Sequence, residues 1–170
     1  VLEVTLRTPA ALDVISIIAK HLPEAVIGAG TVTNRDLLQK SYDAGAKFAI
    51  SPGLTKDLLQ AGKEGNLALI PGISSISELM DGIDSGYDHL KFFPAEASGG
   101  VKAIQSIGGP FPDIKFCPTG GINLNNVRDY LALPNVSCCG GSWLVSDEII
   151  KQANWKEITR LAKQALAHVK

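Results

Sequence analysis

Short runs of β-branched and aromatic residues alternate along the chain with segments in which apolar residues recur at helical spacing. The β-rich runs are residues 1–6, 25–30, 47–51, 67–72, 89–93, 114–117 and 136–141. They start roughly every 20 to 25 residues, which is the length of one strand–helix unit. Segments 34–44, 56–63 and 155–169 have helical spacing, and Gly45 and Gly65 are placed to end two of these helices.

Two helix starts are marked by their residue types. Thr8-Pro9 places a hydroxyl before a first-turn proline, and Ser75 with Glu78 forms a capping-box pattern. We therefore expect a helix to begin after each of these positions.

Continuous strand–helix alternation predicts a parallel sheet in an α/β fold, either doubly wound or closed into a barrel. Candidate functional residues follow nearly every predicted strand and are not gathered around one crevice. This distribution favours a (β/α)8 TIM barrel. A complete barrel has eight units, but seven are visible and the sequence begins inside a strand. We expect the N-terminal helix and first βα unit to be missing from this chain. No linker interrupts the pattern, so residues 1–170 are predicted to form a single barrel domain.

Side-chain parity in the first strand separates an apolar face from a polar one. Leu2, Val4 and Leu6 share one parity and should face the helices. Glu3, Thr5 and Arg7 share the other, so three polar side chains would line a barrel interior that is usually apolar. A structural Glu3–Arg7 pair is one interpretation, and a polar active-site wall is the other.

The same test on residues 89–93 directs Leu90 and Phe92 toward the helices and Lys91 inward. A desolvated ammonium group has a lowered pKa, which makes a neutral nucleophilic amine accessible. An inward lysine and an inward glutamate suit imine chemistry on a carbonyl substrate, although a purely structural lysine stays open. Lys115 shares the inward parity but starts its strand, so it is expected at the opposite end of a barrel from the catalytic mouth.

Two glycine pairs follow the last two predicted strands, in CPTGGIN (117–123) and CCGGSW (138–143). Paired glycines let backbone N–H groups approach an anion closely, and many barrels bind phosphate after their last two strands. A phosphate site is therefore predicted there. GAGT (28–31) lacks the remaining features of a dinucleotide fingerprint and is interpreted as a tight strand end that presents Thr31.

Composition narrows the class of protein. Sixteen basic and 17 acidic residues nearly cancel, so no charge excess indicates a nucleic-acid partner. The sequence contains no apolar run of about 18 residues, so no membrane span is predicted. We expect a cytoplasmic protein. The odd number of cysteines without metal-ligand spacing predicts buried structural thiols, not a disulfide or a metal site: Cys117, Cys138 and Cys139.

Seven segments together resemble one known family. They are VLEVTLRTP, GAGTV, FAISPGL, LIPGI, KFFPAE, FCPTGGI and GGSWLV, in this order. The chain is similar along its whole length to the 2-keto-3-deoxy-6-phosphogluconate (KDPG) aldolases, also called 4-hydroxy-2-oxoglutarate aldolases. The resemblance implies a class I, Schiff-base lyase without metal or other cofactor, usually a homotrimer of TIM barrels. It implies cleavage of KDPG to pyruvate and glyceraldehyde 3-phosphate in the Entner–Doudoroff pathway of carbohydrate metabolism. It also implies cleavage of 4-hydroxy-2-oxoglutarate to pyruvate and glyoxylate.

The resemblance also implies roles for individual residues. Lys91 would form the imine and Glu3 would be the general acid/base. The pyruvyl end of the substrate would be held by Arg7, Thr31, Pro52 and Phe93, and the phosphate by Thr119, Gly120, Gly121, Gly141 and Ser142. Two alternatives stay open: an aldolase for the galactonate epimer, and a phosphate-binding barrel isomerase or decarboxylase that uses Lys91 as a plain base.

Overall fold

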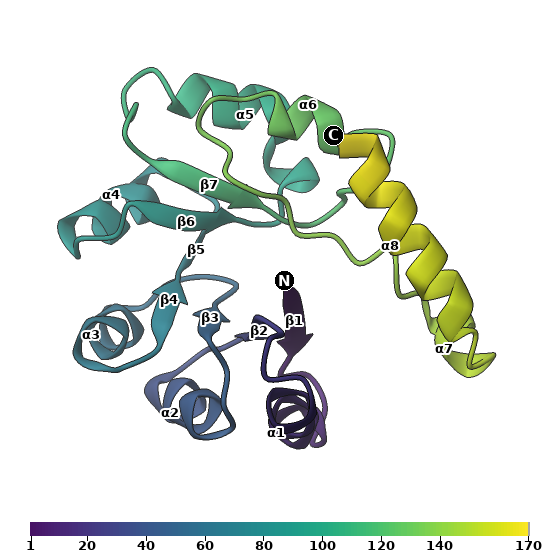
Figure 1. Ribbon diagram of the computed structural model, residues 1–170. Coiled ribbons are helices and arrows are strands. Elements are labelled where there is room, and N and C mark those ends of the chain that lie inside the picture. Colours follow the sequence, from purple (N-terminus) through teal and green to yellow (C-terminus); the bar gives the residue numbers. More distant parts are fainter. Residues whose placement is uncertain (170) are drawn as a thin grey trace. The chain divides into compact units, whose positions relative to one another are not determined.

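The computed structural model describes residues 1–169, which form an α/β protein with parallel strands (Figure 1). The chain divides into two compact units, the first comprising Val1–Lys91 and the second running from Phe92 onward.

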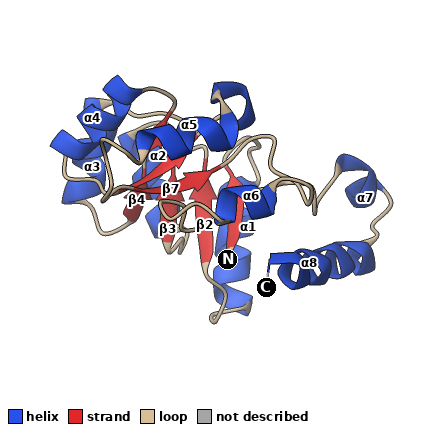
Figure 2. Ribbon diagram, turned by 90° about the horizontal axis from the view of Figure 1, so that it is seen from above, coloured by secondary structure: helices blue, strands red, loops and turns tan. Residues whose placement is uncertain are grey.

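The first unit alternates strands and helices. Its elements are β1 (Leu2–Thr5), α1 (Ala11–His21), β2 (Ile27–Gly30), α2 (Arg35–Asp43), β3 (Phe48–Ile50), α3 (Lys56–Glu64), β4 (Ala68–Ile70), β5 (Gly72–Ile73), α4 (Ile76–Asp84) and most of β6 (His89–Phe92). Strands β1 to β4 pair in sequence order, each parallel to the next. Helices α1, α2 and α3 pack against one side of this sheet (Figures 1 and 2).

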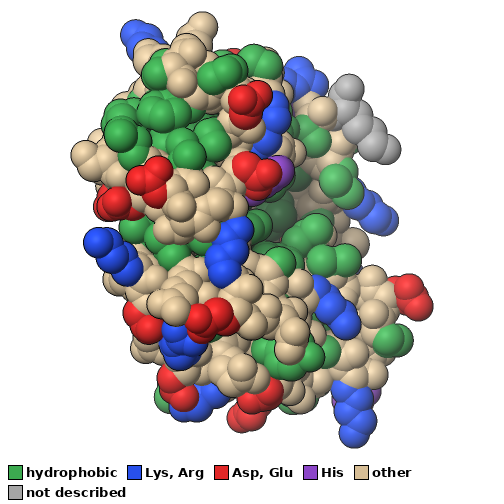
Figure 3. Space-filling view, turned by 90° about the vertical axis from the view of Figure 1, so that its left-hand side faces the viewer, with side chains coloured by type: hydrophobic (Ala, Val, Ile, Leu, Met, Phe, Trp, Pro, Cys, Tyr) green, Lys and Arg blue, Asp and Glu red, His purple; other side chains and the backbone are tan. Residues whose placement is uncertain are grey.

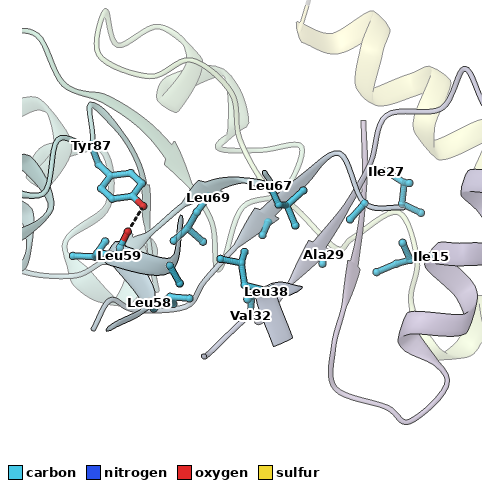
Figure 4. Close-up of a cluster of buried hydrophobic side chains, with 13 residues drawn as sticks. Ile15, Ile27, Ala29, Val32, Leu38, Leu58, Leu59, Leu67, Leu69 and Tyr87 are labelled. Atoms are coloured by element: carbon cyan, nitrogen blue, oxygen red, sulfur yellow. Dashed lines mark hydrogen bonds between the residues drawn. The ribbon is translucent and has the colours of Figure 1, made fainter. Parts of the chain in front are cut away.

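The core of the first unit lies between these strands and helices. Figure 4 shows the fully buried Ile15 of α1 beside Ile27 of β2, with Val32 and Leu38 farther along the same layer. Tyr87 closes the cluster by donating a hydrogen bond of 2.7 Å from its hydroxyl to the carbonyl oxygen of Leu59. The helix-facing sides of the strands therefore carry the apolar residues. Polar side chains such as Glu3 lie on the opposite side of the sheet.

Two helix starts in this unit test the capping predictions. Ser75 and Glu78 form a complete capping box at α4, which confirms that prediction. The prediction for Thr8 is wrong, because the N-cap of α1 is Ala10, which makes no side-chain hydrogen bond there. The carbonyl oxygen of Thr8, not its hydroxyl, accepts from the N–H of Ala11.

The predicted strand 67–72 is divided in the structure. Pro71 separates β4 from β5, since proline has no N–H to donate to a sheet. Its carbonyl oxygen still accepts a hydrogen bond of 2.9 Å from the N–H of Lys91. Strand β6 thus pairs beside β5 in the first unit.

The second unit contains mostly helices. Its elements after Phe92 are a 3-10 turn (Glu96–Ser98), α5 (Gly100–Ile107), β7 (Lys115–Pro118), α6 (Val127–Leu131), α7 (Asp147–Lys151) and α8 (Trp155–Val169). The aromatic rings of Phe92 and Phe116 meet edge to face with their centroids 6.4 Å apart, and both side chains are buried.

The predicted strand 136–141 is wrong as a continuous strand. It pairs with β7 only through isolated bridges, Phe116 with Val136 and Thr119 with Gly140. Three residue steps on β7 span four steps on the other segment, so one extra residue interrupts the ladder in the manner of a bulge. The two segments still run side by side, which brings Gly140 to Thr119.

Candidate active site

Lys91 lies within β6 as a buried lysine. It is 6% exposed, and its neighbours Leu90 and Phe92 are each 1% exposed. Leu90 faces α4, because a Cβ added at Gly82 of that helix would lie 2.8 Å from Leu90 Cδ2. Since strand residues alternate, Lys91 points to the side of the strand away from α4. The parity prediction is confirmed for Leu90, and the inward direction of Lys91 stays a prediction.

Glu3 on β1 lies against a glycine of the next strand. Register pairs Glu3 with Gly28 and Thr5 with Gly30, so all four share one face of the sheet. A Cβ added at Gly30 would lie 1.8 Å from Glu3 Oε1 and 2.6 Å from Cδ. The carboxylate of Glu3 therefore occupies the space above Gly30. Sequence analysis assigned Gly30 only to a tight strand end and missed this contact.

The other residues of the first strand differ in how well they follow the parity prediction. Val4 and Leu6 pack against the buried cluster as predicted, whereas Leu2 is 52% exposed. Arg7 does not pair with Glu3 among the residues that the structure describes. Its Nε donates a hydrogen bond of 3.1 Å to Thr5 Oγ1, so the structural Glu3–Arg7 pair is not formed.

Thr31 follows β2 with a left-handed backbone, at φ +60°. This conformation is unfavourable for a β-branched residue, and such strain concentrates at functional sites. Thr31 is half-buried, directly after Gly30. The strand end therefore presents the threonine, as predicted, and does so in a strained conformation.

Pro52 is held by close backbone packing at the end of β3. A Cβ added at Gly72 would lie 2.4 Å from the carbonyl carbon of Pro52. The N–H of Gly72 also donates a hydrogen bond of 3.2 Å to the hydroxyl of the fully buried Ser51. Ser51 and Gly72 therefore hold the backbone of Pro52 in place. The sequence alone did not reveal these contacts.

In the second unit, the loop after β7 lies on the segment that follows β6. The N–H of Thr119 donates to the carbonyl oxygen of Phe92 at 3.0 Å, and the carbonyl oxygen of Thr119 accepts from Ala95 at 2.8 Å. A Cβ on Gly120 would lie 3.2 Å from Pro94 Cα and 3.3 Å from Phe93 Cδ2. The structure thus brings three predicted site residues of this unit together: Phe93, Thr119 and Gly120.

Gly120 and Gly121 both have positive φ, at +100° and +81°. Only glycine adopts these values without strain. In the part of the chain that the structure describes, neither glycine N–H donates a hydrogen bond to a protein acceptor. Such a turn leaves N–H groups available to an anion.

The second glycine pair is differently placed. A Cβ on Gly140 would lie 2.5 Å from Thr119 Oγ1, so this segment reaches the first glycine loop. Gly141 and Ser142 are exposed, and a Cβ on Gly141 would lie 1.7 Å from the ring of Trp143. The tryptophan ring therefore covers one side of Gly141.

Lys115 and the cysteines have other environments. Lys115 Nζ donates to the carbonyl oxygen of Pro134 at 3.0 Å at the start of β7. None of the three cysteines, all within the described residues, forms a disulfide, but the prediction that they are buried is wrong: Cys138 is exposed, and Cys117 and Cys139 are partly so. The hydrogen bond with Cys138, and then burial, raises the pKa of Cys117. Burial raises the pKa of Cys139 to about 12.

The surface carries charges of both signs (Figure 3). Figure 3 shows acidic and basic side chains interspersed on one face of the molecule. None of the helices in residues 1–169 is long and apolar enough to cross a membrane. Within the same residues, no three acidic, histidine or cysteine side chains are grouped as metal ligands.

These features define an α/β protein with a buried lysine on β6, a glutamate that lies over Gly30 and a turn of two positive-φ glycines after β7. A family model for KDPG and KHG aldolases matches residues 1–161; KHG is 2-keto-4-hydroxyglutarate, another name for 4-hydroxy-2-oxoglutarate. The chain belongs to this aldolase family of lyases.

Relatives support the assignment over nearly the whole chain. A 2-dehydro-3-deoxy-phosphogluconate aldolase of Pseudoalteromonas atlantica is 68% identical, over 98% of this chain and 78% of its own. A KDPG aldolase of Legionella pneumophila, solved with pyruvate as a covalent carbinolamine intermediate, superposes with a TM-score of 0.92. It is 52% identical, over 94% of this chain and 78% of that chain. The KDPG aldolase of Zymomonas mobilis ZM4, solved with 3-phosphoglycerate, has a TM-score of 0.88 and 44% identity, over 96% and 77%. These comparisons do not support the expectation that a first βα unit is missing.

Proposed function

We propose that this chain is a class I aldolase that cleaves KDPG to pyruvate and glyceraldehyde 3-phosphate. We propose the same cleavage of 4-hydroxy-2-oxoglutarate to pyruvate and glyoxylate. The observation that carries the proposal is the burial of Lys91 between Leu90 and Phe92, because a desolvated amine is a better nucleophile than a hydrated ammonium. Membership of the aldolase family supports the reaction class.

In this mechanism the Lys91 amine attacks C2 of the keto acid, and loss of water gives a protonated imine. Glu3 accepts the proton of the C4 hydroxyl as the C3–C4 bond breaks, and the bonding electrons move into the imine to form an enamine. The aldehyde leaves, a proton returns to C3, and hydrolysis releases pyruvate and the free amine. A positioned acid/base of this kind contributes about 10²- to 10⁴-fold.

Four residues are proposed to hold the pyruvyl end. Arg7 supplies a guanidinium for the carboxylate, and Thr31 supplies a hydroxyl on a strained strand end. Pro52 and Phe93 are proposed as apolar walls that exclude water from the imine. The rigid brace of Pro52 by Ser51 and Gly72 supports this positioning role.

The phosphate is proposed to bind Thr119, Gly120, Gly121, Gly141 and Ser142. The two positive-φ glycines and the contact of Gly140 with Thr119 support this assignment. Phosphate at the remote end of the substrate would supply binding energy and orientation.

The larger assembly is also part of the proposal. We propose that the strands form a TIM barrel in a single domain, that three chains form a homotrimer and that the enzyme works in the cytoplasm. Parallel pairing of β1 to β4 with helices on one side supports the barrel. Because the Lys91 imine supplies the electron sink, the proposed reaction needs no metal or other cofactor, and extensive dialysis against a chelator is expected to leave its rate unchanged.

The test is pyruvate release from KDPG, its galactonate epimer and 4-hydroxy-2-oxoglutarate. We expect pyruvate release from KDPG by the unsubstituted protein and loss of this activity in Lys91→Ala. The matched variant Lys115→Ala should keep the activity, because the Lys115 amine binds the carbonyl oxygen of Pro134. Preferred cleavage of the galactonate epimer would select the alternative aldolase. Unchanged turnover in Lys91→Ala would refute the imine mechanism.

A further inference from the structure

The glycine loop after β7 rests on the segment that contains Glu96. The N–H of Glu96 donates to the carbonyl oxygen of Gly120 at 3.1 Å, next to the bond from Ala95 to Thr119. The carbonyl oxygen of Gly121 accepts from the side-chain amides of Asn123 and Asn126, at 3.2 Å and 3.0 Å. These bonds hold the loop carbonyl groups and thereby set the direction of the loop N–H groups.

The side chain of Glu96 supports Gly121 directly. A Cβ added at Gly121 would lie 2.5 Å from Glu96 Cγ and 2.8 Å from Glu96 Cβ. The stem of the glutamate therefore fills the space under the loop, and only a glycine with φ +81° fits above it. If Glu96 adopted another rotamer, this support would be lost.

Tyr130 fixes the position of Glu96. Its hydroxyl donates a hydrogen bond to Glu96 Oε1, and its side chain is fully buried on α6. Glu96 itself is exposed, and its carboxylate also lies beside Gly100, where an added Cβ would be 3.2 Å from Glu96 Oε1. Burial, and then the bond to Glu96, raises the pKa of Tyr130, which keeps the phenol protonated as a donor at neutral pH.

We propose that Tyr130 and Glu96 are positioning residues for the glycine loop and that they set the preference for phosphorylated over unphosphorylated keto acids. This inference rests on the proposed function, since it takes the loop as the phosphate site. Neither residue touches the substrate in this account. Their effect is transmitted through Gly121, whereas the imine chemistry of Lys91 does not involve them.

The first test compares two substrates in Tyr130→Phe. We expect kcat/KM for KDPG to fall about 10-fold, mainly through KM, because a hydrogen bond to a charged group is lost. The value for 4-hydroxy-2-oxoglutarate, which has no phosphate, should stay near that of the unsubstituted enzyme. Tyr87→Phe is the matched control, since it removes the buried hydroxyl that bonds Leu59 in the other unit. It should alter neither the ratio of the two kcat/KM values nor phosphate binding.

A second pair of variants tests Glu96, whose carboxylate accepts the hydrogen bond from Tyr130. Glu96→Gln keeps an oxygen for Tyr130 and a stem under Gly121, so it should retain most of the KDPG preference. Glu96→Ala removes the acceptor oxygen and the Cγ that lies under Gly121, and should lose the KDPG preference. This pair also decides the matter if Tyr130→Phe does not fold.

Binding of inorganic phosphate provides a readout that is independent of catalysis. In the unsubstituted protein, the amide signals of Gly120 and Gly121 should shift on titration with phosphate, with weaker binding in Tyr130→Phe and Glu96→Ala. Equal losses on both substrates, or phosphate binding unaltered in both variants, would overturn the inference. If the unsubstituted protein cleaved neither substrate, the proposed function would fail, and the phosphate titration alone would decide the role of Tyr130 and Glu96.

Discussion

The carboxylate of Glu3 lies directly above Gly30 of the neighbouring strand, in the space that a Cβ at Gly30 would fill. Parallel register places both residues on the same face, with Glu3 opposite Gly28 and Gly30 two pairs farther along. Glycine at position 30 therefore determines where the proposed acid/base rests.

Gly30→Ala should move this carboxylate without unfolding the protein. The new methyl group would meet Glu3 Oε1 at 1.8 Å, and Glu3 is an exposed, flexible side chain that can move away. We expect kcat for KDPG cleavage to fall about 10²-fold. Exchange of the pyruvate methyl hydrogens with deuterated water should fall as well, while borohydride still traps the imine.

Gly109→Ala is a matched control for this variant, because an added Cβ there meets only an ordinary contact of 3.6 Å with the carbonyl oxygen of Ser106. It should leave both rates unchanged. Full methyl-hydrogen exchange in Gly30→Ala would show that the position of Glu3 over Gly30 is irrelevant to proton transfer.

Lys91→Met should separate stability from activity. An apolar side chain of similar length suits a position that is 6% exposed. We expect the variant to stay folded with a free energy of unfolding lower by about 1–3 kcal/mol, because Lys91 interacts with its surroundings and the substitution leaves that partner unpaired. Cleavage should fall about 10⁴-fold or more, since the nucleophile is gone. Urea denaturation and pyruvate release measure the two quantities, and a strongly destabilised variant would argue for a structural role of the amine.

Glu78→Gln should reveal the pH dependence of the α4 capping box. Burial opposes ionisation of Glu78, but hydrogen bonds from Ser74 and Ser75 outweigh it and lower its pKa below the usual 4.5. A lowered pKa in the folded state means that the ionised form stabilises the fold above that pH. The unsubstituted protein should therefore be more stable than the variant at pH 7, and the difference should shrink as the pH falls below 4.5. Denaturation curves at several pH values test this, and a difference independent of pH would contradict it.

Alkylation should distinguish the three cysteines. The thiolate is the reactive form, so raised pKa values slow the reaction of Cys117 and Cys139. Cys138 is exposed and should be modified first by iodoacetamide at pH 8. Peptide mapping by mass spectrometry gives the order, and earlier labelling of Cys117 would contradict the account.

The environment of Lys91 was predictable because it depends on local alternation. Apolar residues on both sides of a lysine in a short strand fix its direction relative to them. The capping box at Ser75 is equally local. Even so, the sequence did not show that Ala10, and not Thr8, would be the N-cap of α1. Nor did it show that Pro71 would divide a strand.

The contacts that position the site depend on residues distant in the sequence. GAG offers two glycines that could receive Glu3, and only the register of β1 with β2 selects Gly30. Likewise, Tyr130 is 34 residues from Glu96, and nothing in either local pattern indicates their hydrogen bond. The predicted strand 136–141 failed for a related reason, because one extra residue between its two bridges to β7 interrupts the pairing.

The central claim is that Lys91 forms a covalent imine with the substrate. The most direct measurement is the intact mass of the protein after incubation with pyruvate and borohydride, followed by peptide mapping. We expect one reduced pyruvyl adduct per chain, located on Lys91, present in Lys115→Ala and absent in Lys91→Ala. A protein that cleaves KDPG without forming any adduct, or that carries the adduct on another lysine, would contradict it.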